Sequence, residues 1–444
     1  MIEALTLDHL LEKIGEVFDN QKDSRKQDRC KYKLRDAGLG AFSVFLTQSP
    51  SFLSHQRTMA KRKGKSNAEQ VFALKRIPTD THMRTLLDGI SSDVLKDVYR
   101  YMMTSLVDTK KLDEFTVPYK ETDYVLLAMD GTEYHRSSKI HCQQCCQRVS
   151  KTGKVSYHHS MIPPVMVHPA RSEVLSLEPE MIRPQDGDAK QDCESKAMKR
   201  WLKESAPHYP LEKVMVLCDD LLCHQPQCEA VLERGWDFIF VCKPESHKTL
   251  YRHLQKADVH TFRRTRWNGR FREIHTYSFA SDLPLKDADD ALRVQWCELH
   301  ITHENTGETL YRNRFVTSLP ITNDSVIDVV RYGRARWKTE NENNNTLKRQ
   351  GHHLEHNYGH GSNGLSALLV SLIILAFLCH TLFRIWDDRY QAIRDDFGSR
   401  KAFFDSLRSQ LIFQLFASWS QLLDSFLQDL DIALPHSTPS LDSS

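Results

Sequence analysis

The stretch Arg331-Tyr-Gly-Arg-Ala-Arg-Trp-Lys-Thr-Glu-Asn-Glu-Asn-Asn-Asn-Thr-Leu-Lys348 carries the most structural and chemical information in the chain. It places a central glutamate, Glu340, among three arginines and two aromatic residues in a segment of helical character. A carboxylate among such groups costs free energy unless it meets a partner or a cation. Two aspartates upstream, each at the end of an apolar run, could complete a metal site with Glu340. This pattern indicates divalent-metal chemistry on phosphate esters.

The two upstream aspartates follow short apolar runs. Tyr124-Val-Leu-Leu-Ala-Met129 leads into Asp130, and Lys213-Val-Met-Val-Leu-Cys218 leads into Asp219 and Asp220. Both runs predict buried strands, so their carboxylates should emerge at the ends of a sheet. The alternative is that such aspartates only cap turns. Asp220 is the alternative to Asp219 as the second acidic ligand.

The third carboxylate is predicted from helix geometry. Arg336 and Glu340 are four residues apart and share a helix face, which favours Glu340 over Glu342 on the roughly opposite side. Lys348, eight residues after Glu340, would lie about 80° away from that face on a regular α-helix. The alternative is a surface helix held by salt bridges worth under about 1 kcal/mol.

The order of predicted elements favours an α/β fold around a mixed sheet. Residues 1–118 are predicted to form a basic helical domain, and residues 119–244 with 321–390 the α/β core. The turn-rich, arginine-rich residues 245–320 predict a β-rich insertion. Residues 391–433 predict a helical C-terminal region, and residues 434–444 a disordered tail.

Asp130, Asp219 and Glu340, with the Arg336-Trp-Lys-Thr-Glu340 run, resemble the DDE transposases of bacterial insertion sequences over about residues 120–385. The resemblance is closest to the subgroup with a Tyr-x2-Arg-x3-Glu-x6-Lys signature. Arg336 and Glu340 fit that spacing, whereas Tyr332 is one residue too far upstream and Lys348 one too far downstream. The resemblance implies an RNase H-like core with a β-strand insertion before the glutamate. It also implies that Asp130, Asp219 and Glu340 hold Mg²⁺ or Mn²⁺.

The resemblance implies that this protein is a DNA transposase. Such an enzyme binds terminal inverted repeats, nicks DNA to free a 3′-OH and joins that end to target DNA by two-metal phosphoryl transfer. We expect a homodimer on DNA, in the bacterial cytoplasm and associated with the nucleoid. Arg336 and Lys348 would hold phosphates, and Tyr332 would stack or bond at a strand end. The alternative is a non-catalytic DNA-binding protein derived from a transposase.

Charge is concentrated in segments that suit a polyanion. The chain as a whole carries a net +2, whereas residues 1–76 hold 15 Lys or Arg and nine Asp or Glu, a net +6. A solvated basic face is the alternative. Asn268-Gly269 predicts a hairpin with a type I′ turn, and a basic loop is predicted at residues 61–65. The expected DNA contacts in these two places are Lys61, Arg62, Lys63, Arg263, Arg264, Arg266, Trp267 and Arg270.

The cysteine pattern leaves a zinc site open. Eleven cysteines, with no secretory signal at the N-terminus, predict mainly reduced thiols. Cys142-x2-Cys145, with His158 and His159 nearby, has half of a zinc-site spacing. A second loose group could meet it in space; its members are Cys218, Cys223, His224 and Cys228. Ordinary buried thiols are the alternative.

Residues 365–383 form an apolar run of 19 residues without Asp, Glu, Lys or Arg. That length could cross a bilayer. A fully buried helix in a large core has the same pattern. Because the run stands alone and its flanks show no clear positive bias, we expect no membrane partner.

Overall fold

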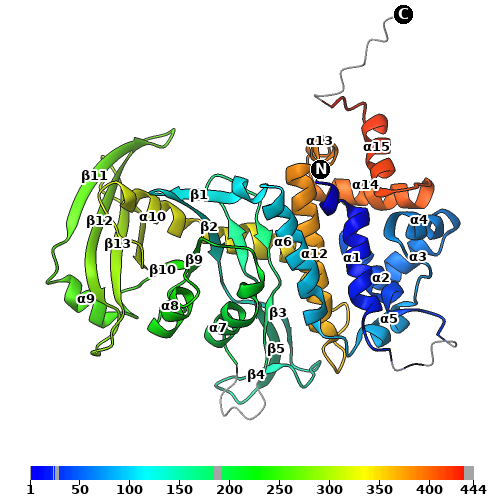
Figure 1. The fold of residues 1–444 in the computed structure, drawn as a ribbon, viewed down its shortest axis with the longest axis horizontal. Helices are drawn as coiled ribbons and strands as arrows, with labels where there is room; N and C mark the ends of the chain where they lie inside the picture. Colours follow the sequence, from blue (N-terminus) through cyan, green and yellow to red (C-terminus); the bar gives the residue numbers. More distant parts are fainter. Residues whose placement is uncertain (1, 24, 26–29, 185–191, 435–444) are drawn as a thin grey trace, which may run out of the picture.

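The computed structural model describes residues 2–23, 25, 30–184 and 192–434. The predicted disordered tail lies outside the described residues from position 435 on. A mixed sheet runs through the middle of the molecule, its long strands form one end, and helices from both chain termini form the other (Figure 1). The predicted α/β class is confirmed.

Among the described residues, ten strands form the main sheet. Its centre has the order β7-β6-β2-β9-β10, in which β2 is parallel to β9 and β9 to β10, while β6 is antiparallel to both its neighbours. This is a mixed sheet, as the predicted order of elements favours. The bounds are β2 (Thr122–Ala128), β6 (Val165–Val167), β7 (Leu175–Ser176), β9 (Val214–Cys218) and β10 (Asp237–Val241), with β1 (Thr116–Tyr119) beside β2.

The central strands are buried on both faces, which explains their uninterrupted apolar sequences. All five residues of β9 are buried, as are the last five of β2 and the last four of β10. Apolar and polar residues would alternate along these strands only if one face of the sheet were exposed to water. The apolar runs therefore predict these strands well.

The β-rich insertion extends the core sheet. Its strand β14 (Thr309–Thr317) pairs antiparallel with β10, with Ile239 opposite Thr317. The sheet continues outward through β13 (Arg293–His303), β12 (Arg272–Pro284) and β11 (His260–Trp267), and α9 (Lys248–Leu254) precedes them. The core and the insertion therefore form one continuous hydrogen-bonded sheet.

The predicted type I′ turn at Asn268-Gly269 is wrong. Trp267 pairs with Arg272, so four residues, not two, connect β11 to β12. The Asn268 side-chain oxygen accepts hydrogen bonds from the backbone N–H groups of Arg270 and Phe271. This turn, built on the asparagine side chain, competes with the two-residue turn, and it puts Arg270 in the loop instead of on a strand face.

A smaller sheet follows Asp130 in the chain. It has the order β3-β5-β4, with β8 paired to β5. The bounds are β3 (Thr132–Ser137), β4 (Cys146–Val149), β5 (Val155–Ile162) and β8 (Glu180–Ile182). Helices α7 (Glu194–Glu204) and α8 (Gln225–Leu232) then lead to and from β9.

Helices from the two ends of the chain pack together (Figure 1). The His380 ring bonds the Leu46 carbonyl at 2.7 Å, and the Asn67 side-chain amide donates to the Leu411 carbonyl at 2.9 Å. The N-terminal helices are α1 (Leu7–Asp19), α2 (Leu34–Leu46), α3 (Phe52–Met59), α4 (Arg62–Phe72), α5 (Asp80–Leu87) and α6 (Lys96–Asp108). The C-terminal ones are α12 (Leu365–Trp386), α13 (Asp388–Asp396), α14 (Arg400–Phe413) and α15 (Trp419–Asp429).

The apolar run of residues 365–383 forms most of α12. By length and composition this helix could cross a membrane, but 94% of its most apolar window is buried inside the protein. It contacts α2, α13 and β7. The buried-helix interpretation therefore fits the structure, and the membrane anchor does not.

Candidate active site

Asp130 and Asp219 follow two neighbouring parallel strands at their carboxyl ends. β2 and β9 pair with Ala128 opposite Leu217. The ladder continues where the Met129 N–H donates to the Leu217 carbonyl at 2.9 Å. The same register, carried two residues further, sets Asp130 beside Asp219. Since neighbouring strands are about 4.8 Å apart, both carboxylates lie together at this edge of the sheet.

The Asp130 carboxyl is the electrostatic centre of the site. Burial raises the pKa of Asp130 to about 6, against the lowering effect of the Arg336 guanidinium. The carboxylates of Asp219 and Glu340 raise this pKa further. Arg336 Nη1 lies 3.3 Å from Asp130 Oδ2. The charges of Asp219 and Glu340 therefore act on the Asp130 carboxyl, although the three residues come from distant parts of the sequence.

Glu340 belongs to a helical segment that follows β14. The segment starts as α10 (Ser325–Arg334), continues into a π-helix at Thr339–Asn344 and ends as α11 (Asn345–Arg349). A π-helical turn inserts one extra residue into an α-helix and is frequent at functional sites. The side chain of Glu340 is exposed, which leaves it accessible to a ligand.

The π-helix changes the expected position of Lys348. On a regular α-helix, position 348 would be rotated about 80° from Glu340. Because the π-helical segment absorbs one extra residue, position 348 returns to the face of Glu340. The Lys348 ammonium forms an ion pair with Glu355 at 3.2 Å.

Tyr332 does not reach the site. Its side chain is fully buried, and its hydroxyl donates to the Pro118 carbonyl at 2.5 Å. The predicted DNA contact of Tyr332 is therefore wrong, because the ring faces the protein interior beside β1.

Glu194 is a fourth carboxylate at the site that sequence reasoning missed. Burial raises the pKa of Glu194 to about 7, and the charges of Asp130 and Asp219 add to the effect. A Cβ atom on Gly131 would lie 2.1 Å from the Glu194 carboxyl group, so Gly131 leaves the space that this side chain occupies. Acidic residues are common in the first turn of helices, so nothing in the sequence marks Glu194.

Asp220 is engaged elsewhere. Its carboxylate accepts the Lys243 backbone N–H at 2.6 Å and the Ser246 hydroxyl at 2.5 Å. His247 lies 3.4 Å from the same carboxylate. Asp220 thus caps the turn after β10, which leaves Asp219 as the better candidate.

The donor set suits a hard divalent cation. Asp130, Asp219, Glu340 and Glu194 supply carboxylate oxygens, the ligand type that Mg²⁺ and Mn²⁺ prefer. Opposite them, Arg336 forms an ion pair with Asp130. Burial raises the pKa values of Asp130 and Glu194, and a bound cation would favour the charged forms of both carboxyl groups.

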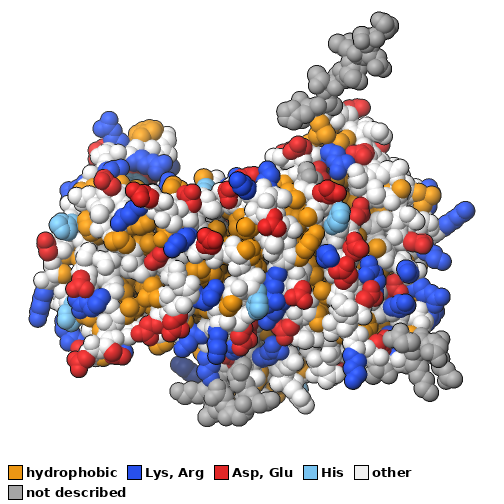
Figure 2. All heavy atoms as spheres, in the orientation of Figure 1, with side chains coloured by type: hydrophobic (Ala, Val, Ile, Leu, Met, Phe, Trp, Pro, Cys, Tyr) orange, Lys and Arg blue, Asp and Glu red, His pale blue; other side chains and the backbone are white. Residues whose placement is uncertain are grey.

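The arginine-rich hairpin presents its predicted contacts to solvent. Arg263, Arg264, Arg266 and Arg270 are exposed, and Trp267 is 61% exposed. Figure 2 shows Lys and Arg side chains gathered over the end of the long strands β11 and β12, at the upper left. In the register of β11 and β12, Arg263 and Trp267 share one face while Arg264 and Arg266 share the other.

A groove lies between this hairpin and α10, which ends two residues before Arg336. A cavity of about 270 Å³ lies between α10 and the strands β11, β12 and β13, lined by Arg266 on the sheet side and by Arg331 and Arg334 on the helix side. Trp337 lines it too and is 46% exposed. Arg334 packs over the Tyr311 ring, 4.5 Å from its centroid. The groove thus combines cationic side chains with aromatic rings.

Lys61, Arg62 and Lys63 are exposed but do not form the predicted loop. They stand at the start of α4, and the Lys63 ammonium donates to the Phe413 carbonyl at 2.5 Å. This contact joins an N-terminal helix to a C-terminal one. Sequence composition indicated a loop because glycine and lysines dominate the stretch, but packing against α3 and α14 stabilises the helix.

The predicted cysteine and histidine groups do not meet. Among the described residues, Cys142 and Cys145 cluster with His159 and His360, whereas Cys223 clusters with Cys242 and His247. His141 stacks on Tyr157 and is not part of the first cluster.

Comparisons with known proteins add little to this geometry. No family model and no curated protein matches the chain. Among solved structures, the chain is similar to a piggyBac transposase synaptic complex with hairpin DNA, determined by cryo-EM. The similarity covers 99% of this chain and 86% of that one, at 11% sequence identity and a TM-score of 0.41. A similarity of this size says nothing about activity.

Proposed function

We propose that this chain is a DNA transposase of the DDE type, which cleaves and joins DNA by metal-dependent phosphoryl transfer. The observation that carries the proposal is the electrostatic effect of Asp219 and Glu340 on the Asp130 carboxyl, which also forms an ion pair with Arg336. These residues come from two strand ends and one helix, in the order that the resemblance to DDE transposases implies.

The three carboxylates would hold Mg²⁺ or Mn²⁺. When bound, a pair of such cations activates the attacking oxygen and stabilises the leaving oxygen of a phosphodiester. Arg336 holds the Asp130 carboxylate in place at 3.3 Å and offers its other N–H groups to a phosphate. Glu194, with a pKa of about 7, exchanges its proton near neutral pH and is a candidate further ligand.

The groove between β11 and α10 is the proposed path of DNA toward these carboxylates. Arg266, Arg331 and Arg334 would contact phosphates, and the exposed rings of Trp267 and Trp337 would stack on unpaired bases. The DNA would be the element's terminal inverted repeats and then target DNA, bound by a homodimer.

One experiment tests the catalytic assignment. Asp130→Asn, Asp219→Asn and Glu340→Gln should each reduce Mg²⁺-dependent nicking of DNA bearing the element's ends by 100-fold or more, because each removes a charged oxygen ligand. DNA binding, measured by mobility shift, should persist in all three variants. Glu342→Gln is the matched control on the same helix and should keep its activity. Wild-type-like nicking by any of the three variants would exclude that residue from the site.

A second candidate is a DNA-binding protein without catalysis. The observation that favours it is the departure from the signature, because Tyr332 is buried and Lys348 pairs with Glu355. Specific binding by the wild-type chain, with no strand scission in Mg²⁺ or Mn²⁺, would support this candidate over the first.

A further inference from the structure

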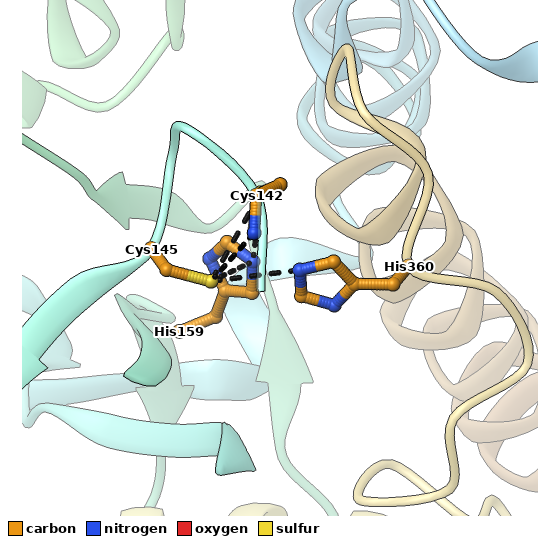
Figure 3. A group of neighbouring side chains, drawn as sticks. All are labelled: Cys142, Cys145, His159 and His360. Atoms are coloured by element: carbon orange, nitrogen blue, oxygen red, sulfur yellow. Dashed lines mark hydrogen bonds between the residues drawn. The ribbon is translucent and has the colours of Figure 1, made fainter. Parts of the chain in front are cut away.

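Four potential metal ligands converge outside the candidate active site (Figure 3). Cys142 and Cys145 come from the loop between β3 and β4, and His159 comes from β5. His360 comes from the segment between α11 and α12, about 200 residues later in the chain. Cys145, His159 and His360 are at least nine-tenths buried.

The distances between the four donor atoms match a tetrahedral metal site. Around one Zn²⁺, ideal bond lengths place two sulfur atoms about 3.8 Å apart, and a sulfur and a nitrogen about 3.6 Å apart. The Sγ atoms of Cys142 and Cys145 are 4.0 Å apart. His159 Nε2 lies 3.5 Å from the first sulfur and 3.3 Å from the second. His360 Nε2 lies 3.5 Å from Cys145 Sγ.

These contacts are poorly explained without a metal. Buried polar groups normally have strong hydrogen-bond partners, whereas here two thiols and two imidazoles mainly face one another, and thiols are weak donors. The two sulfurs are also far beyond the roughly 2.05 Å length of a disulfide.

Neighbouring residues of the same types have other partners. The thiol of Cys146 points to the Ile182 carbonyl, 3.8 Å away. The ring of His141 stacks on Tyr157 with the centroids 4.1 Å apart. The ligand set is therefore two cysteines and two histidines, the closed donor set of structural zinc sites.

We propose that Cys142, Cys145, His159 and His360 bind one structural Zn²⁺. Thiolate and imidazole ligands in tetrahedral geometry select Zn²⁺ over harder cations such as Mg²⁺. The site is separate from the carboxylates and takes no part in the proposed strand cleavage.

The zinc ion would hold together two parts of the chain that each follow a candidate active-site residue. β3 begins two residues after Asp130, and His360 follows Glu340 by 20 residues. The His360 segment is also held by Asp88, whose carboxylate accepts the N–H groups of Ser362 and Asn363. Zinc would therefore fix the small sheet against the segment that leads from the Glu340 helix into α12.

The test is the zinc content of the untagged, full-length protein, measured by inductively coupled plasma mass spectrometry. We expect one zinc per chain in the wild type and a decrease of fivefold or more in Cys145→Ser and His360→Ala. The matched controls Cys146→Ser and His141→Ala should keep one zinc per chain. Because zinc content does not depend on DNA cleavage, this result is independent of the proposed transposase activity.

A second measurement covers variants that fail to fold. Wild-type protein prepared with Co²⁺ in place of zinc should show the visible bands of tetrahedral cobalt together with a thiolate charge-transfer band. Absence of both zinc and the cobalt spectrum in folded wild-type protein would overturn the proposal. So would zinc that remains in Cys145→Ser but is lost in Cys223→Ser, since the metal would then belong to the other cluster.

Discussion

At the scale of single residues, the chain buries several carboxyl groups in environments that favour their neutral form. Asp130 and Glu194 lie in the candidate active site, where a cation would compensate their charge. Glu178 is different, because it is 3% exposed and lies between β7 and β8, outside that site. Burial raises the pKa of Glu178 to about 8, against the lowering effect of Lys96 and Arg100.

Glu178 should make the protein less stable as pH rises. The ordinary pKa of glutamate is 4.5, so between pH 4.5 and about 8 the folded state binds the proton that the unfolded state has released. The free energy of unfolding therefore falls as pH rises through this window, by on the order of a few kcal/mol. Urea unfolding at pH 5 and pH 8 should show a smaller decrease for Glu178→Gln than for the wild type. Glu204→Gln, which changes an exposed residue on α7, should behave like the wild type.

At the scale of elements, the π-helix at Thr339–Asn344 sets the direction of Glu340 relative to α11. Asparagines in and beside this segment favour a departure from the regular α-helix, because asparagine has low helix propensity and bonds readily to nearby backbone. Glu340 and Lys348 are eight residues apart. Because the π-helix absorbs one of these residues, the two positions lie on one helix face, as residues seven apart do on a regular α-helix.

Deleting Asn341 should convert the π-helical turn into a regular α-helix. One residue fewer turns Glu340 by about 100° relative to the residues after it. Metal-dependent nicking should fall by at least tenfold while the far-ultraviolet circular dichroism spectrum stays unchanged. Asn341→Ala keeps the length of the segment and should leave nicking within about twofold of the wild type. A deletion variant with full activity would show that the extra residue has no role in orienting Glu340.

At the scale of the whole molecule, α12 packs between the N-terminal helices and the C-terminal helices. Leu372, Leu375 and Leu378 are fully buried on it, and it also contacts β7 of the core sheet. Its apolar sequence is thus explained by protein contacts on all sides.

Leu372→Ala should destabilise the protein by about 2–5 kcal/mol, because it leaves a cavity in a closely packed core. Leu221→Ala is the matched control, since Leu221 is 58% exposed, and should change stability by under about 0.5 kcal/mol. Chemical denaturation measures both values. We also expect carbonate to extract the wild-type protein from membranes; retention in the membrane fraction would contradict the buried position of α12.

The sequence predicted those parts of the fold and candidate site that depend on local pattern. The strands before Asp130 and Asp219 were predictable because both faces are buried and the runs are continuously apolar. The missed features depend on contacts between distant segments. His360 contacts Cys145, which lies 215 residues earlier in the chain, and Glu194 occupies the space that Gly131 leaves free beside Asp130. The burial of Tyr332 likewise depends on its contact with Pro118.

The packing of both chain ends against each other has a consequence for synthesis on the ribosome. The partner surface of α2 is α12, which begins 319 residues after α2 ends. At a translation rate of about 5–20 residues per second, α12 is synthesised on the order of 15–65 s after the N-terminal helices. During this interval the apolar faces of the N-terminal helices are accessible to chaperones and proteases. A chain truncated before α12 would leave these faces permanently exposed.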